Sequence, residues 1–239
     1  MAERGKGTLF VVSTPIGHLG DMTYRAVETL GAVNVIAAED TRRTRILLNH
    51  YGLKTPLSSF NSYNQAAKSR EFLRRLNAGR DVALVSDAGT PGVSDPLTHL
   101  VQAALEQEVV VTPIPGASAL LAAVTVSGIP ASRFVFQGFL PRKKRRTRTL
   151  ELLASQPFTV VIFESPHRLE KTLADLLTAF GNRPAAIARE LTKKFEEVNR
   201  GTLEDLILAH RGRQWKGEIT LVIAGQDFKD TEKDTRDTE

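Results

Sequence analysis

The chain has 239 residues, of which 41% are hydrophobic and 25% charged, a composition typical of a globular protein with one large domain or two modest ones. The absence of cysteine excludes disulfides and thiolate metal sites, and the apolar runs are too short for a signal peptide or a membrane span, so we expect a soluble cytoplasmic protein. The net charge of +5 combines −3 in residues 227–239 with +8 in the remainder, and six bases fall within residues 142–148, where a polyanionic partner would bind.

The first half of the sequence alternates strand-like apolar runs with helical patterns. The expected strands are residues 8–13, 34–38, 81–86 and 109–113, and the expected helices are residues 24–30, 42–51, 65–78 and 96–106. Near-continuous apolar runs bounded by turn residues are typical of strands buried on both faces. This alternation predicts parallel α/β layers.

A second set of elements follows the sequence PIPG at residues 113–116. The expected strands are residues 133–139, 158–164, 185–190 and 218–224, with helices over residues 118–126, 147–155, 167–180 and 203–210. Because PIPG breaks the chain, we predict an N-terminal α/β domain, residues 1–114, and a C-terminal α/β domain, residues 115–226. Residues 227–239 are almost without apolar side chains and are predicted to form a disordered tail.

Three polar motifs follow predicted strands of the first half: TPIGHLGDMT at residues 14–23, AAEDTRRTR at 37–45 and SDAGTPGVSDP at 86–96. Ligands of open α/β sheets bind beyond the carboxyl ends of the strands, so these loops are candidates for a binding site. Each motif also suits an ordinary turn with a helix cap, from Asp21 or Thr23 in the first and from Asp40 or Thr41 in the second. Both interpretations stay open from the sequence.

The motif SDAGTPGVSDP differs from a phosphate-binding loop. It has no lysine, and Asp87 comes directly after the strand. A fixed carboxylate repels phosphate and suits ribose hydroxyls, an amine or a cation, all of which S-adenosylmethionine offers. A nicotinamide dinucleotide fingerprint is missing, because GHLG does not match G-x-G-x-x-G.

Further motifs follow in the second half. The helix that begins in PGASA offers small residues and free amides to a ligand, although for this motif taken alone close helix–sheet packing is the better explanation. The sequence PRKKRRTR at residues 141–148 reads as a basic loop for phosphate contacts. FESPHR and ARELTKKFEE each place an acid and an arginine after a strand, which fits either a site or a local ion pair. With five scattered histidines we expect no metal site.

Together, the motifs STPIGHLGD, AAEDTR, SDAGTPGVSDP, PGASA, GFLPRKK, FESPHR, ARELTKKFEE and RGTL resemble the tetrapyrrole methylase superfamily, and within it the members that methylate small-subunit ribosomal RNA. The resemblance implies two α/β domains with S-adenosylmethionine in the inter-domain cleft, a homodimer, and 2′-O-methylation of a cytidine ribose in the decoding region of 16S ribosomal RNA. It also implies the cofactor contacts, which are Pro15, Ile16, Gly17, Asp87, Ala88, Gly89, Pro91, Ser118, Ala119, Phe163 and Ala188.

A ribose hydroxyl is a weak acid, so the reaction would benefit from a base. The candidates, which the sequence does not rank, are Asp21, Asp40, Glu164 and Glu190. The candidates for holding RNA phosphates are Arg42, Arg142, Lys143, Lys144, Arg145, Arg146, Arg189 and Lys193. Two alternatives stay open: a corrin or siroheme C-methyltransferase of the same fold, and a non-catalytic ribosome-associated RNA-binding module.

Overall fold

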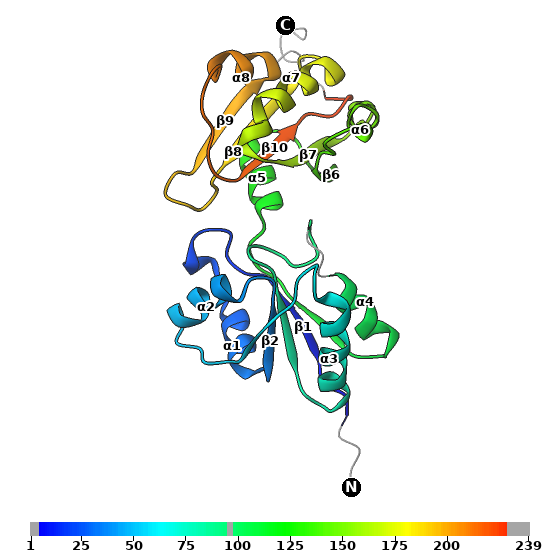
Figure 1. Cartoon of the computed structure of the whole chain (residues 1–239). Coiled ribbons are helices and arrows are strands. Elements are labelled where there is room, and N and C mark those ends of the chain that lie inside the picture. Colours follow the sequence, from blue (N-terminus) through cyan, green and yellow to red (C-terminus); the bar gives the residue numbers. More distant parts are fainter. Residues whose placement is uncertain (1–4, 95–97, 229–239) are drawn as a thin grey trace, which may run out of the picture. The chain divides into compact units, whose positions relative to one another are not determined.

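The computed structural model describes residues 5–94 and 98–228, and the chain divides into two compact units, Met1–Ser118 (unit 1) and Ala119–Glu239 (unit 2) (Figure 1). The domain boundary expected after residue 114 lies close to this division. The disorder expected for the tail concerns mainly residues 229–239, which lie outside the described residues, as does the expected helix start at residue 96.

Unit 1 contains a sheet of five parallel strands in the order β3-β2-β4-β1-β5. In chain order the strands are β1 (Leu9–Val12), β2 (Val35–Ala38), β3 (Leu57–Ser59), β4 (Val82–Val85) and β5 (Val111–Ile114). The parallel sheet confirms the expectation from the alternating pattern. The strand β3 was not predicted, because three residues with two serines carry no hydrophobic signal.

Helices cover both faces of this sheet. They are α1 (Tyr24–Ala32), α2 (Thr41–His50), α3 (Gln65–Asn77) and α4 (Thr98–Glu106), and a 3₁₀ turn, η1 (Leu19–Asp21), precedes α1. Successive strand residues belong to different cores: Val35 and Ala37 pack with residues of α3 and α4, and Ile36 and Ala38 with residues of α1 and α2. This two-sided burial explains the near-continuous apolar runs of the strands.

Unit 2 contains a mixed sheet in the order β6-β7-β10-β8-β9. The strands are β6 (Phe134–Phe139), β7 (Thr159–Glu164), β8 (Pro184–Arg189), β9 (Glu197–Thr202) and β10 (Ile219–Ile223). β6 and β7 are parallel, and the other pairs are antiparallel. The edge strand β9 was not predicted, since its sequence EVNRGT is polar and only partly buried.

The helices of unit 2 are α5 (Ala119–Ser127), α6 (Arg145–Ala154), α7 (Leu169–Phe180) and α8 (Leu203–Ala209), with a 3₁₀ turn, η2 (Pro166–Arg168), before α7. α6, α7 and α8 share one core with alternate residues of the sheet, among them Val160, Ile162 and Leu221. α5 packs against β8, β9 and β10.

Candidate functional site

In unit 1, the loops after β1, β4 and β5 are bonded to one another at the carboxyl edge of the sheet. Thr14 and Gly89 exchange two backbone hydrogen bonds, of 2.9 and 3.0 Å. The hydroxyl groups of Ser13 and Thr90 lie 3.0 Å apart, and Thr90 also bonds to the carbonyl oxygen of Ala117 at 3.3 Å. The strand order places β4, β1 and β5 side by side, so three motifs that are distant in the sequence form one surface.

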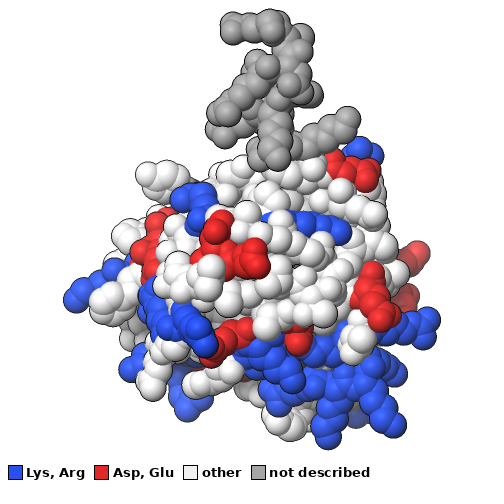
Figure 2. Space-filling model, turned by 90° about the horizontal axis from the view of Figure 1, so that it is seen from above, with Lys and Arg blue, Asp and Glu red and all other residues white. Residues whose placement is uncertain are grey.

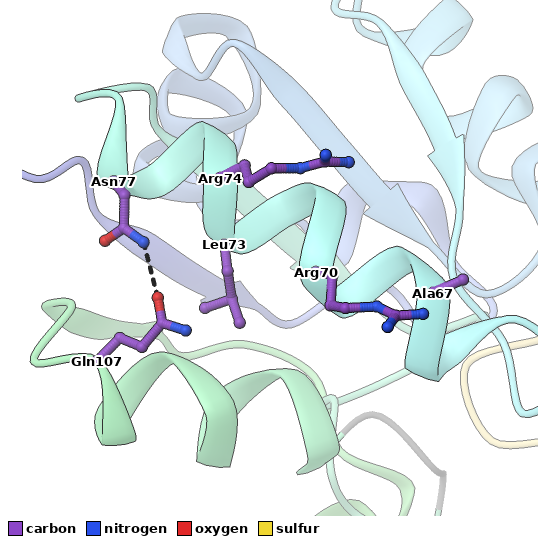
Figure 3. A pocket seen from close by; sticks show the side chains of 6 residues that line it. All are labelled: Ala67, Arg70, Leu73, Arg74, Asn77 and Gln107. Carbon is purple, nitrogen blue, oxygen red and sulfur yellow. Dashed lines mark hydrogen bonds between the residues drawn. The ribbon is translucent and has the colours of Figure 1, made fainter.

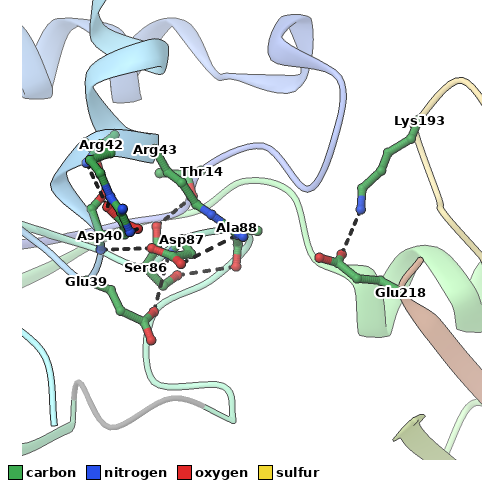
Figure 4. A network of polar contacts seen from close by, with 11 residues as sticks. Thr14, Glu39, Asp40, Arg42, Arg43, Ser86, Asp87, Ala88, Lys193 and Glu218 are labelled. Atoms are coloured by element: carbon green, nitrogen blue, oxygen red, sulfur yellow. Dashed lines mark hydrogen bonds and ion pairs between the residues drawn. The ribbon is translucent and has the colours of Figure 1, made fainter. Parts of the chain in front are cut away.

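Asp87 connects this surface to the end of β2 (Figure 4). Its Oδ1 accepts a hydrogen bond of 2.9 Å from the backbone amide of Asp40, and its own amide donates to Glu39 at 3.4 Å. The other carboxylate oxygen lies 3.6 Å from a guanidinium nitrogen of Arg43. The side chain remains 28% exposed. Asp87 is therefore a fixed, accessible carboxylate, as the sequence predicted, with an arginine beside it that the sequence did not assign.

The turn residues around Asp87 have distinct positions. Ile16 and Pro91 are buried, whereas Gly17 and Ala88 are exposed. Gly89 has a φ of +79°, and a Cβ there would lie 3.4 Å from the Ile16 side chain. A glycine at this place relieves the strain of the left-handed conformation and lets the loop after β4 lie on the loop after β1.

The remaining predicted contacts of unit 1 are Pro15, in the loop after β1, and Ser118, in the loop after β5. Pro15 and Ser118 are half-buried. A Cβ on Gly116 would come within 3.0 Å of the Ser13 side chain, so a small residue is needed where this loop crosses the end of β1. For Gly116 this contact fits the packing interpretation, whereas the cofactor contacts of Ser118 and Ala119 stay predictions.

In unit 2, Phe163 and Ala188 lie on the two strands that flank β10, each paired with Thr220. Residues paired in this way point to the same face of an antiparallel sheet. Ala188 is buried and Phe163 half-buried, and the Phe163 ring makes edge contacts with Phe136 and Phe139 at centroid distances of 4.9 and 5.9 Å. Ala119 begins α5 and is half-buried.

The four candidate bases differ sharply in environment. Asp21 is exposed at the end of η1 and makes no ion pair among the described residues. Asp40 caps α2, and hydrogen bonds from the side chain and the amide of Arg42 lower its pKa to about 2, which makes it a weak base. Burial raises the pKa of Glu190, but hydrogen bonds from the Glu218 amide and from Lys193 more than compensate and leave that pKa below its usual value.

Glu164, the fourth candidate base, is buried and enclosed by hydrogen-bonding partners. Its side chain is 0% exposed, and its carboxylate accepts hydrogen bonds from Thr172 Oγ1 at 2.6 Å and from the Ser165 amide at 2.7 Å. Arg168 lies 3.5 Å away. A group enclosed in this way does not reach a substrate, so we correct the expectation that Glu164 is a candidate base.

The predicted phosphate contacts fall into two groups. Arg42 is exposed but bonded to Asp40, Arg189 bonds to two backbone carbonyl groups, and Lys193 lies 2.9 Å from Glu190 and 3.0 Å from Glu218. Within the basic cluster, four of the predicted contacts are exposed: Arg142, Lys143, Lys144 and Arg145. Arg148, the sixth base of the cluster, is also exposed. Figure 2 shows that Lys and Arg side chains gather on one side of the face it presents, with acidic side chains scattered between them.

Within this cluster, the structure corrects the prediction that Arg146 is an exposed phosphate contact. It was expected in an exposed loop, but α6 begins at Arg145 and Arg146 is 8% exposed. Its guanidinium donates hydrogen bonds of 2.8 Å to Asp175 and to Thr172. Arg146 recurs with Leu150 and Leu153 on the buried side of α6, a helical spacing that the run of bases concealed.

A hollow of about 680 Å³ lies beside α3 and the end of α4 (Figure 3). It is lined by Ala67, Arg70, Leu73, Arg74, Asn77 and Gln107. None of the strand-end loops contributes to it, so we assign no cofactor to this hollow. In the described part of the chain, no group of three or more His, Asp or Glu side chains is placed to hold a metal ion. No helix formed by these residues is long and apolar enough to cross a membrane.

Comparison with known sequences identifies relatives over most of the chain. A family model described as Tetrapyrrole (Corrin/Porphyrin) Methylases matches residues 8–207. The ribosomal RNA small subunit methyltransferase I of Synechocystis is 52% identical over 221 residues, which are 92% of this chain and 79% of that protein. The protein of the same name from Thermotoga maritima is 48% identical over 221 residues, which are 92% of this chain and 100% of that protein.

Solved structures share the fold at low sequence identity. Cobalt precorrin-4 methyltransferase superposes with a TM-score of 0.67 at 17% identity, covering 93% of this chain and 96% of that one. Uroporphyrin-III C-methyltransferase from Thermus thermophilus, solved with S-adenosyl homocysteine, has a TM-score of 0.63 at 20% identity and covers 92% and 98% of the two chains. The chain therefore belongs to the tetrapyrrole methylase family and, within it, to the ribosomal RNA small subunit methyltransferase I proteins.

Proposed function

We propose that the chain transfers a methyl group from S-adenosylmethionine to the 2′-oxygen of a cytidine ribose in 16S ribosomal RNA, with cytidine 1402 as the target. The observation that carries the proposal is Asp87, a fixed and accessible carboxylate where four strand ends of unit 1 are bonded together. The names of the relatives, which are up to 52% identical, support ribosomal RNA as the substrate.

The residues around Asp87 fit a cationic methyl donor with a ribose. The carboxylate offers acceptor oxygens for hydroxyl or ammonium groups, and the loop has no lysine that would favour phosphate. The exposed Ala88 leaves the backbone of the loop accessible to a ligand. When bound, the cofactor supplies a methyl group on a positively charged sulfur, and its displacement leaves a neutral thioether.

Of the candidate bases, Asp21 fits the reaction best. It is exposed, it lies in the loop after β1, and it is not committed to an arginine or lysine among the described residues. In the proposed step, the ribose 2′-oxygen forms a bond to the methyl carbon as the carbon–sulfur bond breaks, and the hydroxyl proton passes to the Asp21 carboxylate. Alignment of the attacking oxygen supplies most of the acceleration, and the base adds to it.

For RNA binding we propose four exposed bases of the basic cluster, Arg142, Lys143, Lys144 and Arg145. Phosphate contacts of this kind position an RNA without reading its sequence. We also propose that the protein is a homodimer, as the family resemblance implies, and that it is cytoplasmic, as the composition of the sequence indicates. The substrate is the small ribosomal subunit or its 16S ribosomal RNA.

A label-transfer experiment tests the proposal. The purified protein is incubated with methyl-labelled S-adenosylmethionine and small ribosomal subunits from a strain that lacks the modification, and the labelled nucleotide is mapped. We expect label on the 2′-oxygen of one cytidine of 16S ribosomal RNA. Label on a tetrapyrrole offered in the same assay, with none on RNA, would instead identify a C-methyltransferase. Failure to bind the cofactor would favour a non-catalytic RNA-binding protein.

A further inference from the structure

The basic segment of unit 2, residues 141–146, is attached at both of its ends. At its start, the guanidinium group of Arg168 donates to the carbonyl oxygens of Leu140, at 2.8 Å, and Pro141, at 3.4 Å. At its end, the buried Arg146 donates to Thr172 Oγ1 at 2.8 Å. The four basic side chains between these attachments are exposed to solvent.

Both attachments lead to Glu164, the last residue of β7. The Thr172 hydroxyl that accepts from Arg146 donates to Glu164 Oε2 at 2.6 Å. The Nε of Arg168 lies 3.5 Å from Glu164 Oε1, which also accepts from the Ser165 amide at 2.7 Å. A carboxylate that is 0% exposed is stable only when it is paired and hydrogen-bonded, so these contacts are mutually dependent.

Arg146 is further fixed by Asp175, one turn along α7 from Thr172. The guanidinium Nε donates to Asp175 Oδ2 at 2.8 Å, and the Arg146 side chain is 10% exposed. Arg146 is thus one of six bases in this run, but it is buried and forms its contacts within unit 2 instead of binding a phosphate at the surface. This is the arrangement expected of a residue that shapes the segment rather than one that binds RNA.

We infer that Glu164 is a positioning residue, which through Thr172, Arg146 and Arg168 holds the basic segment in one shape for the RNA backbone. The inference rests on the proposed function, because it assigns the segment to ribosomal RNA. We call the contacts among these four residues the clamp. A segment that is ordered before binding loses less conformational entropy on association, so the clamp raises the affinity for RNA. Glu164 also follows Phe163, a predicted cofactor contact, so the clamp joins the segment to that end of β7.

Limited proteolysis tests the clamp without reference to activity. Thr172→Val keeps the shape of the side chain and removes the hydroxyl that joins Arg146 to Glu164. Trypsin cleaves after Lys and Arg in mobile segments, so we expect cleavage within residues 142–146 to become about tenfold faster than in the wild type. Thr178→Val is the matched control, since Thr178 is an exposed residue of α7 whose hydroxyl bonds to its own helix. Thr172→Ser retains the hydroxyl and should restore resistance.

Steady-state methylation of small subunits tests the role of the clamp. For Thr172→Val and Glu164→Gln, we expect the KM for subunits to rise about tenfold, since the segment must be ordered on binding. The kcat and the affinity for S-adenosylmethionine, measured by calorimetry, should stay within about twofold of the wild type, because neither residue contacts the reacting atoms.

Other results would overturn the inference. Loss of kcat in Glu164→Gln with an unchanged tryptic pattern would make Glu164 a group that acts on the substrate. Faster proteolysis of Thr172→Val with an unchanged KM would separate the clamp from RNA binding, and unchanged proteolysis would refute the clamp itself. If the wild type fails to methylate subunits, the proposed function fails, while the tryptic comparison still decides whether the clamp exists.

Discussion

The backbone amide of Asp40 donates a 2.9 Å hydrogen bond to the carboxylate of Asp87, which joins the end of β2 to the end of β4. Asp87 therefore has a structural and a proposed cofactor-binding role, and two substitutions separate them. Asp87→Asn keeps an oxygen for the Asp40 amide and loses the charge, whereas Asp87→Ala loses both.

We expect both Asp87 variants to bind S-adenosylmethionine at least about tenfold more weakly, because each lacks the negative charge that complements the cofactor. Only Asp87→Ala should lose folding stability, by about 1–2 kcal/mol, since it leaves the Asp40 amide without its acceptor. Titration calorimetry and denaturant unfolding measure the two effects. Equal cofactor affinity in the wild type and Asp87→Ala would refute the proposed role of this loop.

If Asp21 is the base, replacing it should lower kcat without weakening the binding of either substrate or cofactor. Asp21→Asn removes the proton acceptor and nearly preserves the side-chain shape, so kcat should fall about 100-fold or more. The KM for subunits and the affinity for the cofactor should change little. Glu190→Gln is the comparison, because Glu190 is committed to Lys193 and to the Glu218 amide. An Asp21→Asn enzyme with wild-type kcat would exclude Asp21 as the base.

The turn before β10 depends on a glycine. Gly217 has a φ of +89°, and a Cβ there would overlap the side chain of Glu190. We expect Gly217→Ala to reduce the free energy of unfolding by about 3 kcal/mol, from backbone strain and steric overlap together. Gly212→Ala is the control, since Gly212 has a φ of +72° with open space around it, and should cost about 1 kcal/mol. Similar losses in the two variants would contradict the predicted overlap with Glu190.

These positions show what the sequence could predict. The alternation of strands and helices and the turn residues predicted where the strand-end loops lie. Asp87 was selected because it directly follows a strand. Both predictions were possible because they depend only on residues close together in the sequence. Arg146 and Glu164 are buried because α6, α7 and β7 pack together. A run of basic residues in the sequence does not indicate this tertiary packing. Only the spacing of Arg146 from Leu150 and Leu153 indicated that one of the bases faces inward. The arginine beside Asp87, Arg43, belongs to α2, so its contact with the loop after β4 likewise depends on tertiary structure.

The lowered pKa of Glu197 predicts that the folding stability depends on pH. Its hydrogen bonds from Arg213, against a smaller opposing effect of burial, lower its pKa to about 2. The folded state then binds the proton more weakly than the unfolded state, so the stabilisation is complete above about pH 5 and is lost as the pH falls toward 2. The stability difference between the wild type and Glu197→Gln, measured by urea unfolding, should therefore shrink over this range. A stability difference that stays constant over this pH range would refute the prediction.

The salt dependence of RNA binding distinguishes bases that contact phosphates from those that shape the fold. Replacing the four exposed bases, residues 142–145, with glutamine should reduce the slope of log affinity against log salt by about 3, since each contact to single-stranded RNA contributes about 0.7. Arg146→Gln removes one more charge of the same run, but from a buried position. It should destabilise unit 2 and weaken RNA binding with a smaller change of slope, because the four exposed bases remain. An unchanged slope in the fourfold variant would mean that the segment is merely solvated, and an equal change of slope in Arg146→Gln would mean that Arg146 contacts phosphate directly.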